Sequence, residues 1–434
     1  MATLEIASSA EQATPAKLRQ IVLASVLGTA VEWYDFLIYG VGAALVFNKL
    51  FFPTFDPLVG TLAAFGSYAV GFVARPLGGA IFGHFGDRLG RKAMLTMTMV
   101  IMGGGTFLIG LLPTYSQIGI LAPTLLILLR LLQGIGIGGE WGGAVLMVIE
   151  SGDAKRRGFL GSLVQVGFPL GMVLATIVFA AVSKLPEADF LAWRWRIPFL
   201  VSVLLVGVGL FVRLKLVETP KFQQVRARND IARLPIVEVL LKDWRNFLIA
   251  VGLKVTEVAW VYILTVFIVF YASSRLALPR AVMLDAVLYA ALLEMLTIPL
   301  FGLLSDRIGR KALYIAGAIF SALFAFPLFS LLETRDTTII TLTIALAMSL
   351  SHGMMFGPQA AFLPELFGTK VRYSGASLGC QVSAAISGGF APLIATALLA
   401  WENGTHSISL YMVCLSAITL VAVFAARETA FREL

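Results

Sequence analysis

A small set of ionisable side chains stands within long apolar stretches of this sequence. A charge surrounded by hydrocarbon costs about 2.5–3.5 kcal/mol or more unless it meets a partner or water, so each is a candidate functional group. Buried carboxyls can bind and release a proton near neutral pH, and a guanidinium can hold a carboxylate through two hydrogen bonds. The side chains are Glu32, Asp35, Glu140, Glu257, Glu294, Arg75, Arg130, Lys254 and His352.

Two carboxyls and a phenol share one face of the first apolar stretch. Glu32, Asp35 and Tyr39 follow one another at steps of three and four residues, which places them on one side of a helix. We predict that this face lines a cavity and that Asp35, with Glu32 beside it, carries a transported proton. The alternative is that both acids only form permanent ion pairs with Arg75 or Arg130.

The two arginines are candidate anion contacts. Arg75 lies about two helical turns before Gly83, well inside its apolar stretch, and we predict that it anchors a substrate carboxylate. It could instead be the permanent partner of an acid on a neighbouring helix. Arg130 lies about 13 Å from the far end of its helix, which suits either a gate or a second carboxylate contact.

The second half of the chain adds polar and aromatic candidates. Lys254 and Glu257 are three residues apart and can neutralise each other, or form a gate if they separate. His352 opens a run with Gly and Pro, where hydrogen-bonded packing is favoured over a proton relay. Glu140 adjoins a face of glycines and is expected to serve helix packing. The predicted substrate site comprises Arg75, Arg130, Tyr39, Trp141, Glu257, Trp260 and His352.

The elements that must position these residues are membrane-spanning helices. The 434 residues are 59% hydrophobic and 13% charged, with a mean hydropathy of +0.89, whereas soluble domains are about 25% charged. Apolar runs of about 20 residues, enough to cross a bilayer, recur along the chain. We predict twelve spans, over residues 20–46, 58–84, 93–112, 121–149, 157–182, 196–212, 247–272, 281–304, 312–332, 337–363, 372–399 and 407–426.

The basic residues indicate topology rather than nucleic-acid binding. The net charge is +8, and most Lys and Arg fall in loops on the same side as the N-terminus. By the positive-inside rule, both termini are then cytoplasmic. We therefore expect a multi-pass protein of a plasma membrane, the inner membrane of a bacterium, that binds no nucleic acid.

The chain contains one plan twice. Residues 83–92 read GHFGDRLGRK and residues 302–311 read GLLSDRIGRK, about half the chain apart. This repeat predicts two six-helix bundles, residues 1–212 and 247–434, joined by a cytoplasmic linker with an interfacial helix over 213–246. Charges in and near these loops are expected to latch the cytoplasmic side: Asp87, Arg88, Arg91, Glu150, Arg157, Asp306, Arg307, Arg310, Glu365 and Arg372.

The paired loops resemble the loop motif of the major facilitator superfamily, over essentially the whole chain. Other segments resemble its metabolite:proton symporters, namely 32–36, 74–79, 133–143 and 195–199. Among these symporters the chain is most similar to the shikimate permease group, in 82–87, 139–143 and 371–376. The resemblance implies an all-α membrane protein whose two pseudo-symmetric bundles rock about a central cavity and open it alternately to each face.

We therefore predict a proton-coupled symporter that imports a small organic anion, with shikimate-like hydroxylated ring acids first and dicarboxylates or oxo acids next. An osmolyte (proline or betaine) symporter and a drug–proton antiporter of the same fold are the alternatives. Osmolyte carriers of the family often have a C-terminal coiled coil, and no heptads follow the last span here. No enzyme, cofactor or metal is expected, and the functional unit is predicted to be a monomer.

Overall fold

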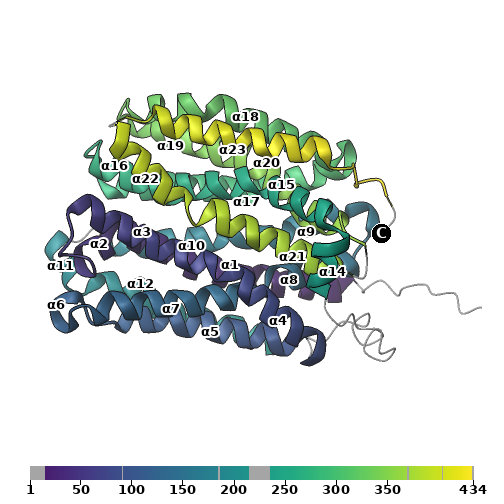
Figure 1. Cartoon of the computed structure of the whole chain (residues 1–434), viewed down its shortest axis with the longest axis horizontal. Coiled ribbons are helices and arrows are strands. Elements are labelled where there is room, and N and C mark those ends of the chain that lie inside the picture. Colours follow the sequence, from purple (N-terminus) through teal and green to yellow (C-terminus); the bar gives the residue numbers. More distant parts are fainter. Residues whose placement is uncertain are drawn as a thin grey trace, which may run out of the picture.

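The computed structural model describes residues 15–89, 91–183, 186–214, 235–368, 371–402 and 404–432. Helices make up nearly all of this part, and they run side by side along the long axis of the molecule (Figure 1). The side chains of Asp87, Arg88 and Arg91, which form the first copy of the predicted loop latch, lie outside the described part.

The helices account for the twelve predicted spans. Within the described residues, eleven helices are long and apolar enough to cross a membrane, and Thr96–Leu111 is a shorter apolar helix. The main helices of the first half are α1 (Pro15–Gly42), α3 (Pro57–Val73), α4 (Arg75–Leu89), α5 (Arg91–Leu111), α7 (Leu121–Ile137), α8 (Trp141–Ser151), α9 (Arg157–Gln165), α10 (Gly167–Ser183) and α12 (Ile197–Leu214).

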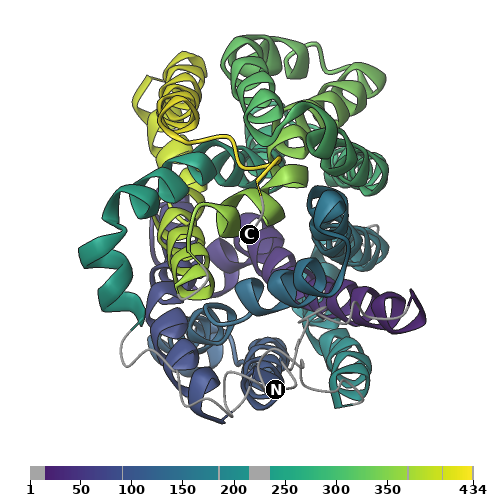
Figure 2. The ribbon, with the colours of Figure 1, turned by 90° about the vertical axis from the view of Figure 1, so that its right-hand side faces the viewer.

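The second half repeats this arrangement. Its main helices are α15 (Trp244–Tyr262), α16 (Ile268–Ser274), α17 (Arg280–Ile308), α18 (Arg310–Leu332), α19 (Thr337–Leu346), α20 (Met354–Glu365), α21 (Arg372–Ser383), α22 (Ala391–Glu402) and α23 (His406–Ala425). In Figure 2, which looks along the helices from the end that carries the C-terminus, most helices of the first half lie below those of the second. The short helix α14 (Pro235–Lys242) packs on α15 and α21.

The surface is apolar and the interior is partly polar, which inverts the pattern of a soluble protein. Leu204, Leu296 and Leu323 are each about 70% exposed, whereas Arg130 and Glu294 are fully buried. Helices satisfy their own backbone groups, so such a surface suits lipid tails. The buried polar groups then face one another in the interior.

Several of the predicted spans are not continuous α-helices in the structure. Segments of π-helix interrupt four of them, at Ala43–Phe47, Ile263–Phe267, Ala347–Gly353 and Ala384–Gly388. Such insertions often mark functional sites, because they re-aim side chains and loosen the backbone. The hydrophobic pattern could not predict them, since a wider turn hardly alters composition.

Glycines bring the helices that carry the two arginines into close contact. A side chain on Gly134 would collide with the backbone of Gly71, and one on Gly138 would collide with the backbone of Arg75. The glycine face that the sequence indicates on α7 therefore packs directly against α3 and α4. This contact fixes the distance between the backbones that hold Arg75 and Arg130.

The C-terminal segment caps α18. Glu428 accepts hydrogen bonds from the backbone N–H groups of Arg310 (3.0 Å) and Lys311 (3.1 Å), which begin that helix. Gly309 precedes it with φ of 99°, a left-handed conformation that favours glycine. Burial alone would raise the pKa of Glu428, but the backbone donors of Ala430, Arg310, Lys311 and Thr429 outweigh it and hold that pKa below its usual value.

Because the folded protein lowers the pKa of Glu428, this cap is present above the ordinary Glu pKa of about 4.3 and is lost as the pH falls through the folded value. We expect Glu428→Gln to lower the Tm of the purified protein at pH 7 and to change it much less at about pH 2, below the folded pKa of Glu428. Thermal melts of both proteins across this range check the prediction. An equal difference at both pH values would contradict it.

Candidate functional site

The two arginines lie on the same aromatic ring in the interior of the first half. The guanidinium carbon of Arg75 is 4.1 Å from the centroid of Phe36, and that of Arg130 is 3.8 Å from it. Arg130 also lies 4.1 Å from the ring of Tyr39 and 4.9 Å from that of Tyr68. Cation–π contacts hold both positive charges without neutralising them.

Donors of this cluster lack acceptors. Nε of Arg75, and Nε and Nη2 of Arg130, have no hydrogen-bond partner, and neither arginine forms a salt bridge with another described residue. Arg130 donates from Nη1 to Oε1 of Gln133 at 3.3 Å. Tyr68 and Tyr262 add unpartnered hydroxyls. Burying a cation whose donors lack partners costs free energy, which a bound anion would offset. We call Arg75, Arg130, Tyr68 and Tyr262 the arginine cluster.

Asp35 lies beside this cluster. Its carboxyl is 2% exposed, and neither oxygen has a hydrogen bond of ordinary length in the described structure. Thr106 is its polar neighbour, and the charges of Arg130 and Glu32 act on it. The described residues show no salt bridge between Asp35 and Arg130, which is the arrangement that the sequence left open as an alternative. A buried carboxyl without an ion-pair partner is a candidate for binding a proton.

The second half contains a continuous network of charged groups. His352 contacts Oε1 of Glu294 through Nδ1 at 2.7 Å and Oε1 of Glu257 through Nε2 at 3.1 Å. Lys254 donates to Oε2 of Glu257 at 2.9 Å and to Oε1 of Gln359 at 2.8 Å. The amide of Gln359 donates to Oε2 of Glu257 at 2.7 Å.

Within this network Lys254 and Glu257 form the salt bridge that their three-residue spacing suggested. His352 bridges two acids, and the second of them, Glu294, was not among the residues predicted for the site. Its charge within an apolar span made Glu294 a candidate functional group, but its pairing with His352 could not be predicted, because the two residues are 58 positions apart in the chain.

Aromatic rings connect the two halves between the arginine cluster and this network. The ring of Tyr262 lies 5.0 Å from that of Phe72 and 6.4 Å from that of Trp33. Trp33 contacts Phe168 at 4.7 Å, and Phe168 in turn lies 5.1 Å from the ring of His352. The centre of the molecule is therefore closed by rings in this conformation.

The remaining predicted site residues lie around this centre. Tyr39 shares a hydrogen bond of 2.8 Å with Ser67. Trp260 is fully buried with its Nε1 unpartnered. Trp141 lies further towards α9 and donates to Gln165 at 3.3 Å, which places it in the packing between helices rather than beside the arginines. Glu140 is buried at the break between α7 and α8.

Charged residues join the halves at the end that carries the C-terminus. Asp306 accepts hydrogen bonds from the backbone N–H groups of Gly158 (2.8 Å) and Phe159 (2.9 Å), at the start of α9. Arg310 binds Asp306 at 2.7 Å and Glu365 at 3.3 Å, and Arg157 lies 3.5 Å from Glu365. We call Arg157, Asp306, Arg310 and Glu365 the latch cluster, and the end that carries it the latch end.

The other latch candidates lie beside this cluster or outside it. Arg372 is buried, donates to the carbonyl of Phe367 at 3.4 Å and is attracted by Glu150. Arg307 is exposed. The C-terminal segment adds contacts that the sequence did not indicate, because Thr429 donates to Glu365 at 2.6 Å and Arg157 donates to the carbonyl of Arg432 at 2.6 Å.

Asp306→Ala is expected to loosen the latch end. Two charge-assisted hydrogen bonds are worth about 1.5–3 kcal/mol each, so losing them should raise the population of the opened form at least about tenfold. Cys380, buried and within electrostatic reach of Arg75, reports this opening in a Cys414→Ser background. We predict at least about tenfold faster alkylation of Cys380 by a polar maleimide.

Asp336→Ala is the matched control. Asp336 also accepts two backbone N–H groups at a helix start, from Thr338 and Ile339, but both lie within one half of the chain. Its removal should leave the alkylation rate of Cys380 unchanged. Equal rates in wild type and Asp306→Ala would show that Asp306 does not restrain opening.

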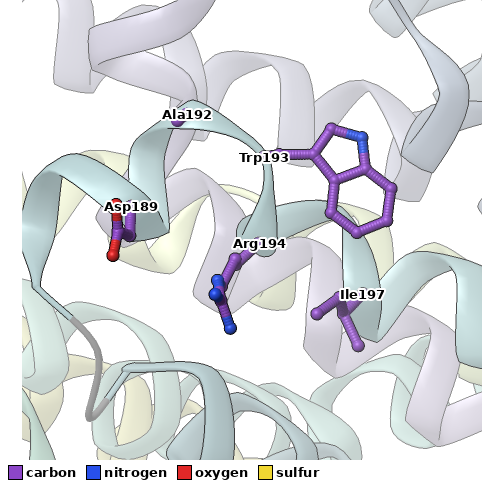
Figure 3. A pocket seen from close by; sticks show the side chains of 5 residues that line it. All are labelled: Asp189, Ala192, Trp193, Arg194 and Ile197. Atoms are coloured by element: carbon purple, nitrogen blue, oxygen red, sulfur yellow. The ribbon is translucent and has the colours of Figure 1, made fainter.

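A surface cavity lies away from all of these charges. It has a volume of about 440 Å³ and is lined by Asp189, Ala192, Trp193, Arg194 and Ile197 (Figure 3). These residues belong to one short stretch of chain at the end opposite the latch, and most of them are exposed. A much smaller gap of about 10 Å³ remains between α4 and α21 at the latch end. The surface cavity is therefore not the site that the buried charges define.

Comparisons with known proteins agree with this architecture. The model of the family described as "Sugar (and other) transporter" matches residues 21–240 and 245–434. The chain is 44% identical to the shikimate transporter of Escherichia coli (strain K12), over 91% of both chains. It is 36% identical to the proline/betaine transporter of Salmonella typhimurium, over 96% of this chain and 85% of that one.

A solved structure gives the same fold. The xylose transporter XylE from E. coli, in a partially occluded inward open conformation, aligns with a TM-score of 0.73 and 18% identity, over 96% of this chain and 100% of that chain. The matched family and the relatives named above are transporters, so the chain is a multi-pass membrane transporter and not an enzyme. The chain belongs to the sugar (and other) transporter family of the major facilitator superfamily, as the loop motifs indicated, and is a secondary transporter.

Proposed function

We propose that this chain imports a small organic anion together with protons, with shikimate-like hydroxylated ring acids as the first substrate class. The observation that carries the proposal is the pair of buried guanidinium groups on Phe36 with free donors. They suit a carboxylate, which accepts two hydrogen bonds from each guanidinium in a fixed geometry. The shikimate transporter at 44% identity supports the ring acid.

Aromatic rings at the same place suit the rest of such a substrate. Tyr68, Phe72 and Tyr262 lie within about 6 Å of one another and can pack against a carbon ring. The phenol hydroxyls of Tyr68 and Tyr262 are free to bind substrate hydroxyls. We propose these tyrosines as substrate contacts in addition to Arg75 and Arg130.

Proton coupling is proposed to operate through Asp35. When Asp35 is ionised, it attracts Arg130 and competes with the substrate for it. When Asp35 is protonated, Arg130 is left to the substrate carboxylate. In this scheme anion binding and proton binding favour each other, and the opening of the latch cluster on the cytoplasmic side releases both. We further propose that both termini lie in the cytoplasm of a bacterial cell.

An osmolyte symporter is the second candidate, because a proline/betaine transporter is 36% identical. Two uncompensated guanidinium groups favour an anion over a zwitterion, whose positive end they repel. They disfavour lipophilic cations still more, which argues against a drug antiporter.

The test is uptake of labelled shikimate by cells that express the chain, at pH 5.5 and 7.5, with and without an uncoupler. We expect saturable uptake that acid stimulates and the uncoupler abolishes. Unlabelled shikimate, shikimate methyl ester, proline and betaine then compete, and only the first should inhibit strongly, because the ester lacks the carboxylate. Inhibition by betaine but not by shikimate would replace the proposal with the osmolyte function.

A further inference from the structure

The geometry points to a second proton carrier in the C-terminal half: we propose that Glu294, His352 and Glu257 bind one exchangeable proton, so that two protons accompany each anion. We call these three residues the acid–histidine triad. The inference rests on the proposed function for its transport readout, and it adds a proton site that is separate from Asp35.

Hydrogen-bond geometry requires a shared proton in the triad. A contact of 2.7 Å between Nδ1 of His352 and Oε1 of Glu294 needs one hydrogen between the two atoms. The contact of 3.1 Å between Nε2 and Oε1 of Glu257 needs another, which the ring supplies. His352 therefore either donates from both nitrogens to two carboxylates, or accepts at Nδ1 from a protonated Glu294.

Charge balance identifies which proton can leave. Lys254 neutralises Glu257 at 2.9 Å, so those two groups stay charged. The remaining proton lies on His352 or on Glu294, and in either case the network as a whole is neutral. Its departure to water leaves one net negative charge in a buried site, since Glu257, Glu294 and His352 are at most 2% exposed. The proton is therefore held while the site is closed and can leave when the site opens.

The position of the triad suits release upon a conformational change. His352 lies in the π-helical segment Ala347–Gly353, and its ring is stacked on Phe356 at 4.5 Å. Phe168 of α10, in the other half of the chain, covers the same ring at 5.1 Å. Parting of the halves withdraws Phe168 and gives water access to the triad. Oε2 of Glu294 has no hydrogen-bond partner and offers a route for the proton.

Other charged groups reach the triad from the helices packed around it. If these neighbouring groups keep their ordinary charge states, the triad still has one exchangeable proton. Those that interact electrostatically with Glu257 are Lys254 and Tyr262 of α15, Tyr314 of α18 and Cys380 of α21. From the first half, Arg75 of α4 acts on Lys254, Tyr262 and Cys380 rather than on the triad itself.

A purely structural role predicts different behaviour. The triad ties together α15, α17 and the segment before α20, and a salt bridge alone would do so without exchanging a proton. Glu294→Gln separates the two roles, because the Gln amide can donate to Nδ1 of His352 and keep the contact. Gln cannot exchange a proton, so only the carrier role is removed.

The test uses purified protein in liposomes with labelled shikimate. A monovalent anion with two protons carries one net positive charge, so an inside-negative membrane potential should accelerate wild-type uptake. In Glu294→Gln one proton remains, and uptake should continue while losing its response to the potential. The limiting accumulation should fall about tenfold per unit of pH gradient, because each transported proton contributes a factor of ten.

Thr419→Val is the matched control for lost buried polarity. Thr419 shares a hydrogen bond of 2.8 Å with Thr256 inside the same half, between α23 and α15. This variant should keep the response to the membrane potential. Wild-type uptake that ignores the potential, or a Glu294→Gln protein that still responds to it, would overturn the triad as a proton carrier while leaving the proposed function intact. Equal loss of exchange and accumulation in Glu294→Gln would overturn it in favour of a structural role.

A second measurement does not depend on the substrate. The ring nitrogens of His352, assigned by comparison with His352→Gln, are followed by NMR from pH 5 to 10. We expect one protonation step that Glu294→Gln moves by more than one pH unit, because it removes the charge 2.7 Å away. An unmoved step would refute the shared proton. If the wild type transports no shikimate, the substrate assignment fails and this titration still decides the triad.

Discussion

Arg130→Met is expected to reduce shikimate uptake at least about 30-fold and to leave the Tm of the protein unchanged or raised. Removing one member of a buried, hydrogen-bonded charge pair costs about 2–5 kcal/mol, which corresponds to a factor of about 30 to several thousand. The same substitution relieves the empty protein of a fully buried cation with two free donors. Function and stability should therefore move in opposite directions.

Initial uptake rates over a range of shikimate concentrations, with thermal melts of the same samples, check this prediction. Arg130→Lys keeps the charge but loses the two-pronged contact, and should recover only part of the uptake. Arg196→Ala is the matched control, since Arg196 also lies over a ring, at 4.4 Å from Trp195, but far from the site. A stability loss in Arg130→Met that parallels the uptake loss would make Arg130 a structural residue.

Asp35→Asn is expected to uncouple one proton from transport. Asn has the shape of a protonated Asp but cannot release a proton, so Arg130 stays available to the substrate at every pH. Exchange of labelled for unlabelled shikimate across the membrane should continue, while the limiting accumulation falls about tenfold per unit of pH gradient. The pH dependence of shikimate affinity should also disappear.

Paired assays of exchange and accumulation in liposomes measure both effects. Asp189→Asn, an exposed acid beside the surface cavity, is the control and should behave as wild type. Combining Asp35→Asn with Glu294→Gln should abolish accumulation altogether and leave only equilibration. If Asp35→Asn alone accumulates shikimate as the wild type does, Asp35 does not carry a coupled proton.

Local features of the sequence were enough to predict the fold. Apolar runs of bilayer length depend on composition alone. The repeated loops at residues 83–92 and 302–311 directly predict two six-helix halves. The charges inside these runs could also be found without a structure, because Arg75, Arg130 and Asp35 have no place in lipid. Their importance follows from the cost of burying a charge, which requires no knowledge of contacts.

Contacts between distant segments could not be predicted. Arg75 and Arg130 share the ring of Phe36 only because glycines bring α4 and α7 together, and His352 meets Glu294 across two helices. From the sequence, His352 was expected to serve hydrogen-bonded packing, whereas in the structure it bridges two acids. One of these acids, Glu294, was not among the residues predicted for the site. The π-helical turn that carries His352 arises from packing and has no signature in hydropathy.

The most direct test of proton-coupled anion import is proton movement caused by the substrate. Liposomes that contain the purified protein, with no pH gradient and with potassium and valinomycin to clamp the potential, receive shikimate on the outside while a dye reports the external pH. We predict that the outside becomes more alkaline as shikimate enters, and that Arg130→Met abolishes the signal. Shikimate entry without any change in external pH would contradict the account.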